Sequence, residues 1–213
     1  MVADLAKSLS KKSEVAISQL KALGKLAPKE MRLAAEWPKH KSWQVLISTI
    51  LSAQTRDETT IAISKILYKK YPSLNKLANA SLSSIQKIIR PVNYYKTKSK
   101  HVLSTSKILI KDFNSKVPNT LDELLTLPGV GRKVGNVYLA EAHKMNVIGV
   151  DTHVARISQK LGWSKNKNPH KIELDLQKLF PEKHWRSINY ICVKFGRSHS
   201  RKEEDEIFSK ISS

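Results

Sequence analysis

Apolar residues recur along this chain at helical spacing and do not alternate as they do in strands. In "WQVLISTILSAQ", one stripe is formed by Leu46, Ile47, Ile50 and Leu51. The same periodicity predicts further helices over residues 59–71, 81–89, 99–113, 121–127, 132–142, 152–161, 170–180 and 184–195. The pattern therefore predicts an all-α protein.

Residues typical of helix ends support these ranges. Thr120 and Glu123 form a capping-box pattern that opens "LDELLTL". Gly162 follows "THVARISQKL", and Asn168 with Pro169 precedes "HKIELDLQKLF". The segments predicted to lack regular structure are the lysine-rich first dozen residues and the "SKNKN" loop.

Charge and cysteine content narrow the classes of function that the chain could have. The 213 residues carry a formal net charge of +20, so nucleic acid is the expected partner, ahead of an anionic membrane. No apolar run approaches the ~20 residues that span a bilayer, and the first residues lack a signal-peptide centre, so we expect an intracellular protein. Cys192 is the single cysteine, which excludes an internal disulfide and any metal site built mainly on thiolates of this chain.

The stretch "LPGVGRK" between two predicted helices suggests a helix-hairpin-helix. Gly129 and Gly131 permit positive φ and bring backbone close to a docked molecule, so outward-facing amides around Val130 and Arg132 could bind phosphate without reading a base. The alternative is an ordinary tight turn between helices. The strongly positive charge of the chain favours DNA binding.

Two residues near the hairpin could carry chemistry. Lys133 lies in the first turn of the helix after the hairpin, beside Arg132, where positive potential should raise the neutral, nucleophilic fraction of its amine. The alternative is a phosphate-binding or solvated lysine. Asp151 begins "DTHVARISQKL" and is expected to cap that helix, which would keep an ionised carboxylate rigidly aimed.

From about Trp43 to Arg197 the chain resembles the endonuclease III family of helix-hairpin-helix DNA glycosylases and abasic-site lyases. The resemblance is carried by "LISTILSAQTRDETT", "IIRPVNYYKTKSKHV", "LPGVGRKVGNV" and "VDTHVARISQKLGW". It implies two helical lobes, a six-helix domain over residues 36–149 and a terminal domain built from residues 1–35 and 150–213. It also implies that Lys133 is the nucleophile and Asp151 the catalytic aspartate.

The resemblance extends to residues that would contact DNA. Gln54 matches the glutamine that fills the space of a flipped base, although it could simply end a helix. Tyr94 lies where relatives carry a wedge between bases, with core packing as the alternative. Asn93 occupies a position where relatives commonly have glycine, and asparagine tolerates a left-handed backbone.

The C-terminus departs from the family pattern. Many relatives follow the Gly-Arg found here at 196 and 197 with four cysteines that bind an iron–sulfur cluster, whereas this chain continues "SHSRKEEDEIFSKISS". We expect no cluster, no metal and no other cofactor. The segment "KEEDEIFSKI" is predicted to form a short closing helix whose glutamates face lysines.

The resemblance implies a monomeric enzyme that removes oxidised or saturated pyrimidines, such as thymine glycol, from damaged duplex DNA through a lysine Schiff base, and then nicks the strand by β-elimination. One alternative is a related glycosylase for alkylated or mismatched bases. Another is a non-catalytic helix-hairpin-helix DNA-binding protein, which would explain the charge and hairpin but not Lys133 together with Asp151.

Overall fold

The computed structural model describes residues 2–28 and 42–212, and every helix falls within those ranges. The helices are α1 (Val2–Leu26), α2 (Ser42–Ser52), α3 (Asp57–Lys70), α4 (Leu74–Ala78), α5 (Leu82–Ile89), α6 (Tyr95–Asp112), α7 (Leu121–Leu125), α8 (Arg132–Ala142), α9 (Thr152–Lys160), α10 (Pro169–Leu179), α11 (Glu182–Ser198) and α12 (Arg201–Ser212). No strand occurs in the described part of the chain, so the predicted all-α class is confirmed.

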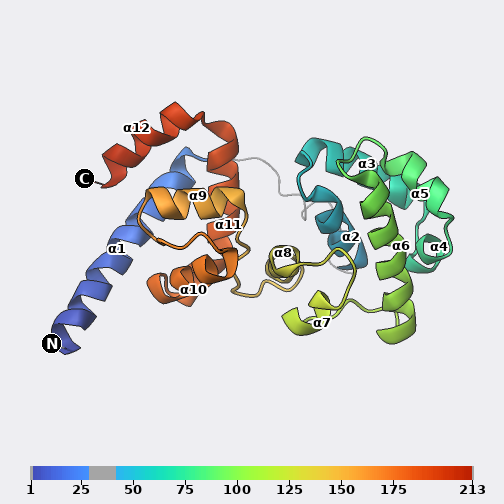
Figure 1. Ribbon diagram of the computed structural model, residues 1–213, viewed down its shortest axis with the longest axis horizontal. Helices are drawn as coiled ribbons and strands as arrows, with labels where there is room; N and C mark the ends of the chain where they lie inside the picture. Colours follow the sequence, from blue (N-terminus) through green and yellow to red (C-terminus); the bar gives the residue numbers. More distant parts are fainter. Residues whose placement is uncertain (1, 29–41, 213) are drawn as a thin grey trace. The chain divides into compact units, whose positions relative to one another are not determined.

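The chain divides into two compact units (Figure 1). One comprises residues 1–30 and 145–213, and the other comprises residues 31–144. The second boundary lies between residues 144 and 145, five residues before the predicted boundary between residues 149 and 150. The predicted boundary at residues 35 and 36 lies outside the described residues.

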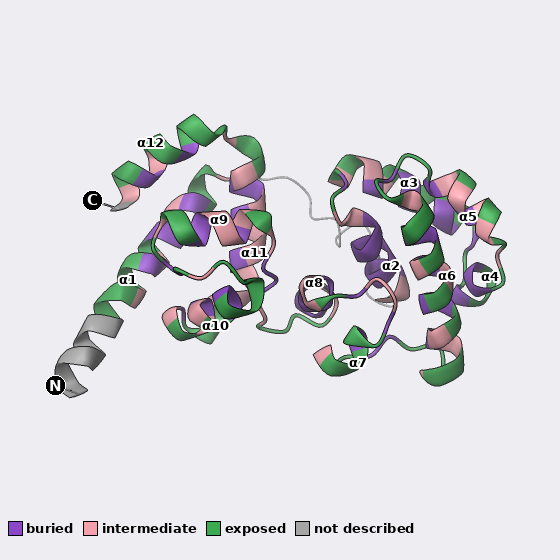
Figure 2. Ribbon diagram, in the orientation of Figure 1, coloured by how far each residue is buried: buried purple, intermediate pink, exposed green. Residues whose placement is uncertain are grey.

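In the unit of residues 31–144, α2 is the central helix, with eight consecutive buried residues from Gln44 to Leu51. Most of its length is buried (Figure 2), and it packs against α3, α6 and α8. Helices α4 and α5 pack on α6, and α7 packs on α8. The short α4 was not among the predicted helices, since five residues are too few to show a period.

In the unit formed by both chain ends, α1 packs against α10, α11 and α12, while α9 packs on α11. The core includes Leu20 and Leu23 of α1 together with Ile157 and Phe195. The prediction that the first dozen residues lack regular structure is wrong, because α1 begins at Val2. The prediction of a loop at "SKNKN" is confirmed.

The predicted closing helix is present as α12, although its pairing differs from the expectation. Phe208 packs on Phe195, with ring centroids 5.7 Å apart. Glu204 pairs with Arg156 and Arg201 rather than with lysines, whereas Asp205 pairs with Lys160. Arginine suits the buried Glu204 because its planar fork can bridge a carboxylate and a second acceptor at once.

Candidate functional site

The two glycines of the hairpin between α7 and α8 differ in what they provide. Gly129 permits the backbone conformation of the turn, whereas Gly131 leaves the surface open. Gly129 has φ +81°, and a Cβ there would lie 2.7 Å from His101 Nδ1. Gly131 has φ −86° and is the N-cap of α8, with nothing within 4 Å of an added Cβ. The prediction of positive φ is therefore confirmed at Gly129 and wrong at Gly131, where the absent side chain leaves exposed backbone.

Hydrogen bonds fix the turn and revise the prediction of outward amides. The Val130 amide donates to the Leu127 carbonyl at 3.1 Å, so it faces the turn and not the solvent. The Val130 side chain is buried. Thr105 of α6 donates to the Pro128 carbonyl at 2.8 Å, which ties the turn to the long helix behind it. The hairpin is thus held rigidly before any ligand binds.

Lys133 lies at the second position of α8, half-buried, directly after half-buried Arg132. The first turn of α8 contains no acidic residue, so the helix N-terminus and Arg132 both add positive potential around the amine. Gly135, two residues later, allows α8 to pack closely on α7, since an added Cβ would lie 2.7 Å from Leu121 Cδ1. These features place a lysine in an electropositive, partly desolvated setting.

Gln54 and Tyr94 lie on two loops that contact each other. Asn93 Nδ2 donates to the Gln54 carbonyl, and both Gln54 and Tyr94 have left-handed backbones, with φ of 55° and 58°. The left-handed residue is thus Tyr94, and Asn93 instead supplies the hydrogen bond. Both side chains are exposed, Tyr94 at 66%, which contradicts the core-packing alternative for Tyr94.

Lys98 is a residue that the sequence analysis missed. Its ammonium is buried and donates to the Leu51 and Ala53 carbonyls and to Thr55 Oγ1. A usable signal existed, because Lys98 is four residues before Val102, on the buried face of α6. Burial, followed by the charge of Lys133, lowers the pKa of Lys98 to about 8.

Asp151 lies in the other unit and caps α9 as expected. Its Oδ1 accepts from the amides of His153 at 3.0 Å and Val154 at 2.9 Å. These bonds fix the carboxylate, which is partly exposed. Gln54, Tyr94, the hairpin and Lys133 all belong to residues 31–144, so the predicted site residues come from both units.

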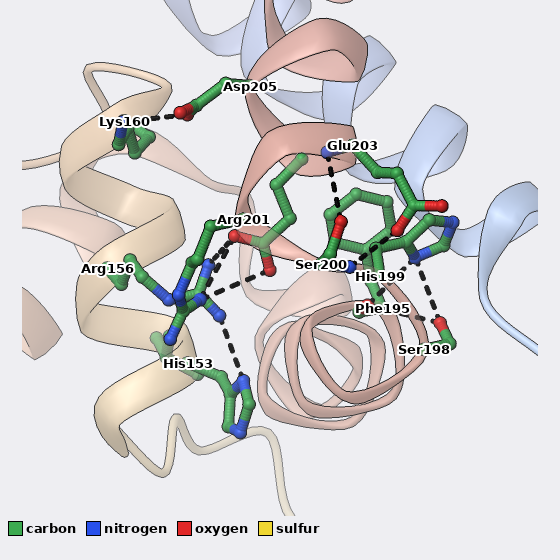
Figure 3. A network of polar contacts seen from close by, with 12 residues as sticks. His153, Arg156, Lys160, Phe195, Ser198, His199, Ser200, Arg201, Glu203 and Asp205 are labelled. Carbon is green, nitrogen blue, oxygen red and sulfur yellow. Dashed lines mark hydrogen bonds and ion pairs between the residues drawn. The ribbon is translucent and has the colours of Figure 1, made fainter.

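A polar network extends along α9 from His153, two residues after Asp151, and joins α9 to α12 (Figure 3). Arg156 Nη2 lies 3.1 Å from His153 Nδ1, and Arg156 also pairs with buried Glu204. Burial and neighbouring arginines lower the pKa of His153, while Asp151 acts in the opposite direction. A neutral imidazole can accept from Arg156. Gly196 makes room for this pair, since a Cβ there would collide with both side chains.

The residues do not fit an iron–sulfur cluster. Cys192 is fully buried in the core of its unit, and burial raises the pKa of its thiol, with the charge of Asp151 adding to the effect. A cluster requires several accessible thiolates, and this chain has one protonated thiol. Within residues 2–28 and 42–212, no three metal-ligating side chains gather, and no helix has the length and apolar character to cross a membrane.

Comparison with known proteins adds to this geometry. Residues 47–182 match the HhH-GPD superfamily of base excision DNA repair proteins. The chain is 43% identical over 155 residues to the Endonuclease III of Thermotoga maritima, covering 73% of each protein. It is 38% identical over 156 residues to that of Synechocystis sp., covering 73% of this chain and 71% of the relative.

Solved structures also match the fold of this chain. A trapped covalent intermediate of endonuclease III with DNA matches with a TM-score of 0.80 at 30% identity, covering 88% of this chain and 87% of that one. A thermostable thymine-DNA glycosylase shares the fold, with a TM-score of 0.78 at 19% identity over 93% of this chain and 94% of that one.

Proposed function

Because the chain belongs to the HhH-GPD superfamily of base excision DNA repair proteins, we propose that this enzyme is a DNA glycosylase that also nicks the resulting abasic site. Its substrate is damaged duplex DNA, and it acts as a monomer without a metal or other cofactor. The preferred lesions are oxidised or saturated pyrimidines such as thymine glycol. This preference rests on the likeness to endonuclease III.

The observation that carries the proposal is the setting of Lys133. The amine is half-buried at the N-terminal turn of α8, with Arg132 beside it and no acidic residue in that turn. Positive potential of this kind favours the neutral amine, which is the nucleophilic form. Endonuclease III, at 30% identity, forms a covalent intermediate with DNA, which supports covalent chemistry in this chain as well.

In the proposed reaction the damaged nucleotide leaves the base stack and exposes its sugar C1′. Neutral Lys133 forms a bond to C1′ while the bond to the base breaks and the base leaves with the electron pair. Asp151, oriented by hydrogen bonds from two amides, stabilises the positive charge that develops on the sugar. The nitrogen of the adduct loses its protons as the C1′–O4′ bond breaks and O4′ takes up a proton, which leaves a C1′=N Schiff base. Loss of a C2′ proton then expels the 3′ phosphate and breaks the strand.

The other contacts hold the DNA. Exposed backbone at Gly131, at the start of α8, suits a phosphate oxygen because helix N-terminal potential and the absent side chain both favour close approach. Gln54 fills the space left by the flipped base, and Tyr94 replaces its lost stacking. Both side chains are exposed on adjoining loops, as these roles require.

A panel of duplexes tests the proposal. We expect excision and nicking of thymine glycol duplexes in the presence of a chelator, and nicking of a duplex with a preformed abasic site. Faster excision of alkylated or mismatched bases would replace the lesion preference with the related glycosylase activity. Tight binding without excision or nicking of any duplex would instead support a non-catalytic clamp.

A further inference from the structure

Lys98 is a buried lysine whose ammonium is held by three acceptors. Its side chain is 6% exposed, and Nζ donates to the Leu51 carbonyl at 2.7 Å, the Ala53 carbonyl at 2.5 Å and Thr55 Oγ1 at 3.1 Å. An ammonium has three donors, so all of them are used. The acceptors lie at the C-terminal end of α2 and just after it, where the helix dipole stabilises a cation.

The segment that Lys98 holds is the turn that carries Gln54. Ala53 and Thr55 flank Gln54, and both accept from the same ammonium. Gln54 itself has an exposed side chain and φ of 55°, a conformation that is strained for a non-glycine residue. Such a backbone persists only where its neighbours are held. Lys98, assisted by the bond from Asn93 to the Gln54 carbonyl, provides that restraint.

The charge environment of Lys98 agrees with this restraint. Burial is the main cause that lowers the pKa of Lys98 to about 8, and repulsion from Lys133 is the second. The three hydrogen-bond partners of its ammonium are all neutral oxygens.

We propose that Lys98 is a positioning residue for the repair reaction, which fixes the Ala53–Thr55 turn so that Gln54 projects outward. This inference rests on the proposed function, since it acts through the gap-filling glutamine.

The first test compares excision from duplex and single-stranded DNA. Lys98→Met keeps the apolar stem and removes the donors and the charge. We expect it to lose about tenfold or more of single-turnover excision from a thymine glycol duplex, with a smaller loss on the same lesion in a single strand, where no gap is filled. Lys107→Met, at an exposed position on the same helix, should match the wild type on both.

The second test separates the charge of Lys98 from the geometry of its hydrogen bonds. Lys98→Arg retains the charge and should still lose part of the duplex activity, because a planar fork does not match the three acceptors.

A third variant covers failure of Lys98→Met to fold. Thr55→Val removes one acceptor, leaves the charge, and should lower duplex excision more than single-strand excision. Equal losses on duplex and single strand in all variants would reduce Lys98 to a structural residue and overturn the inference. Absence of borohydride trapping by the wild type on an abasic-site duplex would overturn the proposed function itself, a distinct outcome.

Discussion

At the scale of single residues, Asp151 combines two roles that one substitution can separate. Its carboxylate caps α9 and, in our account, balances the charge that develops on the sugar. Asparagine also caps helices well but is neutral, so Asp151→Asn should change the free energy of unfolding by less than about 1 kcal/mol. Excision should fall by about 100-fold or more. Chemical denaturation and single-turnover excision measure the two effects.

Asp151→Ala is the matched control for this pair of roles, since it loses both the cap and the charge. It should be less stable than Asp151→Asn and equally inactive. Near-normal excision by Asp151→Asn would assign the carboxylate to capping alone.

Gln54 and Tyr94 are exposed, so their replacement should affect the flipped state rather than the fold. Aromatic stacking contributes ~1 to 3 kcal/mol per base, so Tyr94→Ala should slow duplex excision by about tenfold or more. Gln54→Ala should act in the same direction. Neither should slow excision from a single strand to the same extent. Tyr94→Phe keeps the ring and should retain most activity; equal losses on both substrates would exclude the wedge role.

At the scale of elements, the hairpin glycines should separate folding from binding. Gly129→Ala must place a side chain at φ +81° against His101, so the free energy of unfolding should fall by ~1 to 3 kcal/mol. Gly131→Val places its Cβ in open space and should cost below about 1 kcal/mol, yet it should weaken binding to damaged and undamaged duplexes alike. Normal affinity of folded Gly131→Val would remove the hairpin from the DNA interface.

The ion pairs that join α12 to α9 give a second prediction at this scale. Glu204 is 2% exposed and pairs with Arg156, so Glu204→Gln leaves a partly buried cation without its anion. Because the Arg156 side chain is 18% exposed, we expect a loss of about 2 to 4 kcal/mol in urea unfolding. Asp205→Asn, which breaks the exposed pair with Lys160, should change stability by about 0.5 kcal/mol or less. Equal effects would show that burial of the first pair is unimportant.

Sequence reasoning succeeded where the information is local. Apolar periodicity predicts α2, and side-chain capping at Thr120, Asp151 and Asn168 occurs as the residue types suggest. It failed where contacts between residues far apart in the sequence determine the structure. A lysine is usually solvated, whereas α6 places the Lys98 ammonium at the C-terminal end of α2.

The hairpin and the loop before α6 show the same limit. The pattern Gly-Val-Gly permits a left-handed backbone at both glycines, but only Gly129 adopts it, at a position where His101 leaves no room for a Cβ. Asparagine tolerates a left-handed backbone better than tyrosine, yet Tyr94 is the residue that adopts it, while the Asn93 side chain donates to the Gln54 carbonyl. Both turns contact residues far away in the sequence, which the local pattern does not reveal.

At the scale of the whole molecule, the net charge of +20 and the distribution of the proposed site residues both agree with an enzyme that acts on DNA. Long-range attraction to phosphates brings the enzyme to any duplex, without selecting a base. Selection then depends on which nucleotides leave the stack easily enough to reach the nucleophile. The two residues to which we assign the chemistry belong to different units, Lys133 to residues 31–144 and Asp151 to the other unit.

Identification of the lysine that becomes linked to DNA tests the central claim most directly. Borohydride added during reaction with a thymine glycol duplex should reduce the Schiff base and join protein and DNA, and peptide mapping should find the adduct on Lys133. Lys133→Gln should bind the duplex without trapping or nicking it. An adduct on another lysine, or near-normal turnover by Lys133→Gln, would contradict the account.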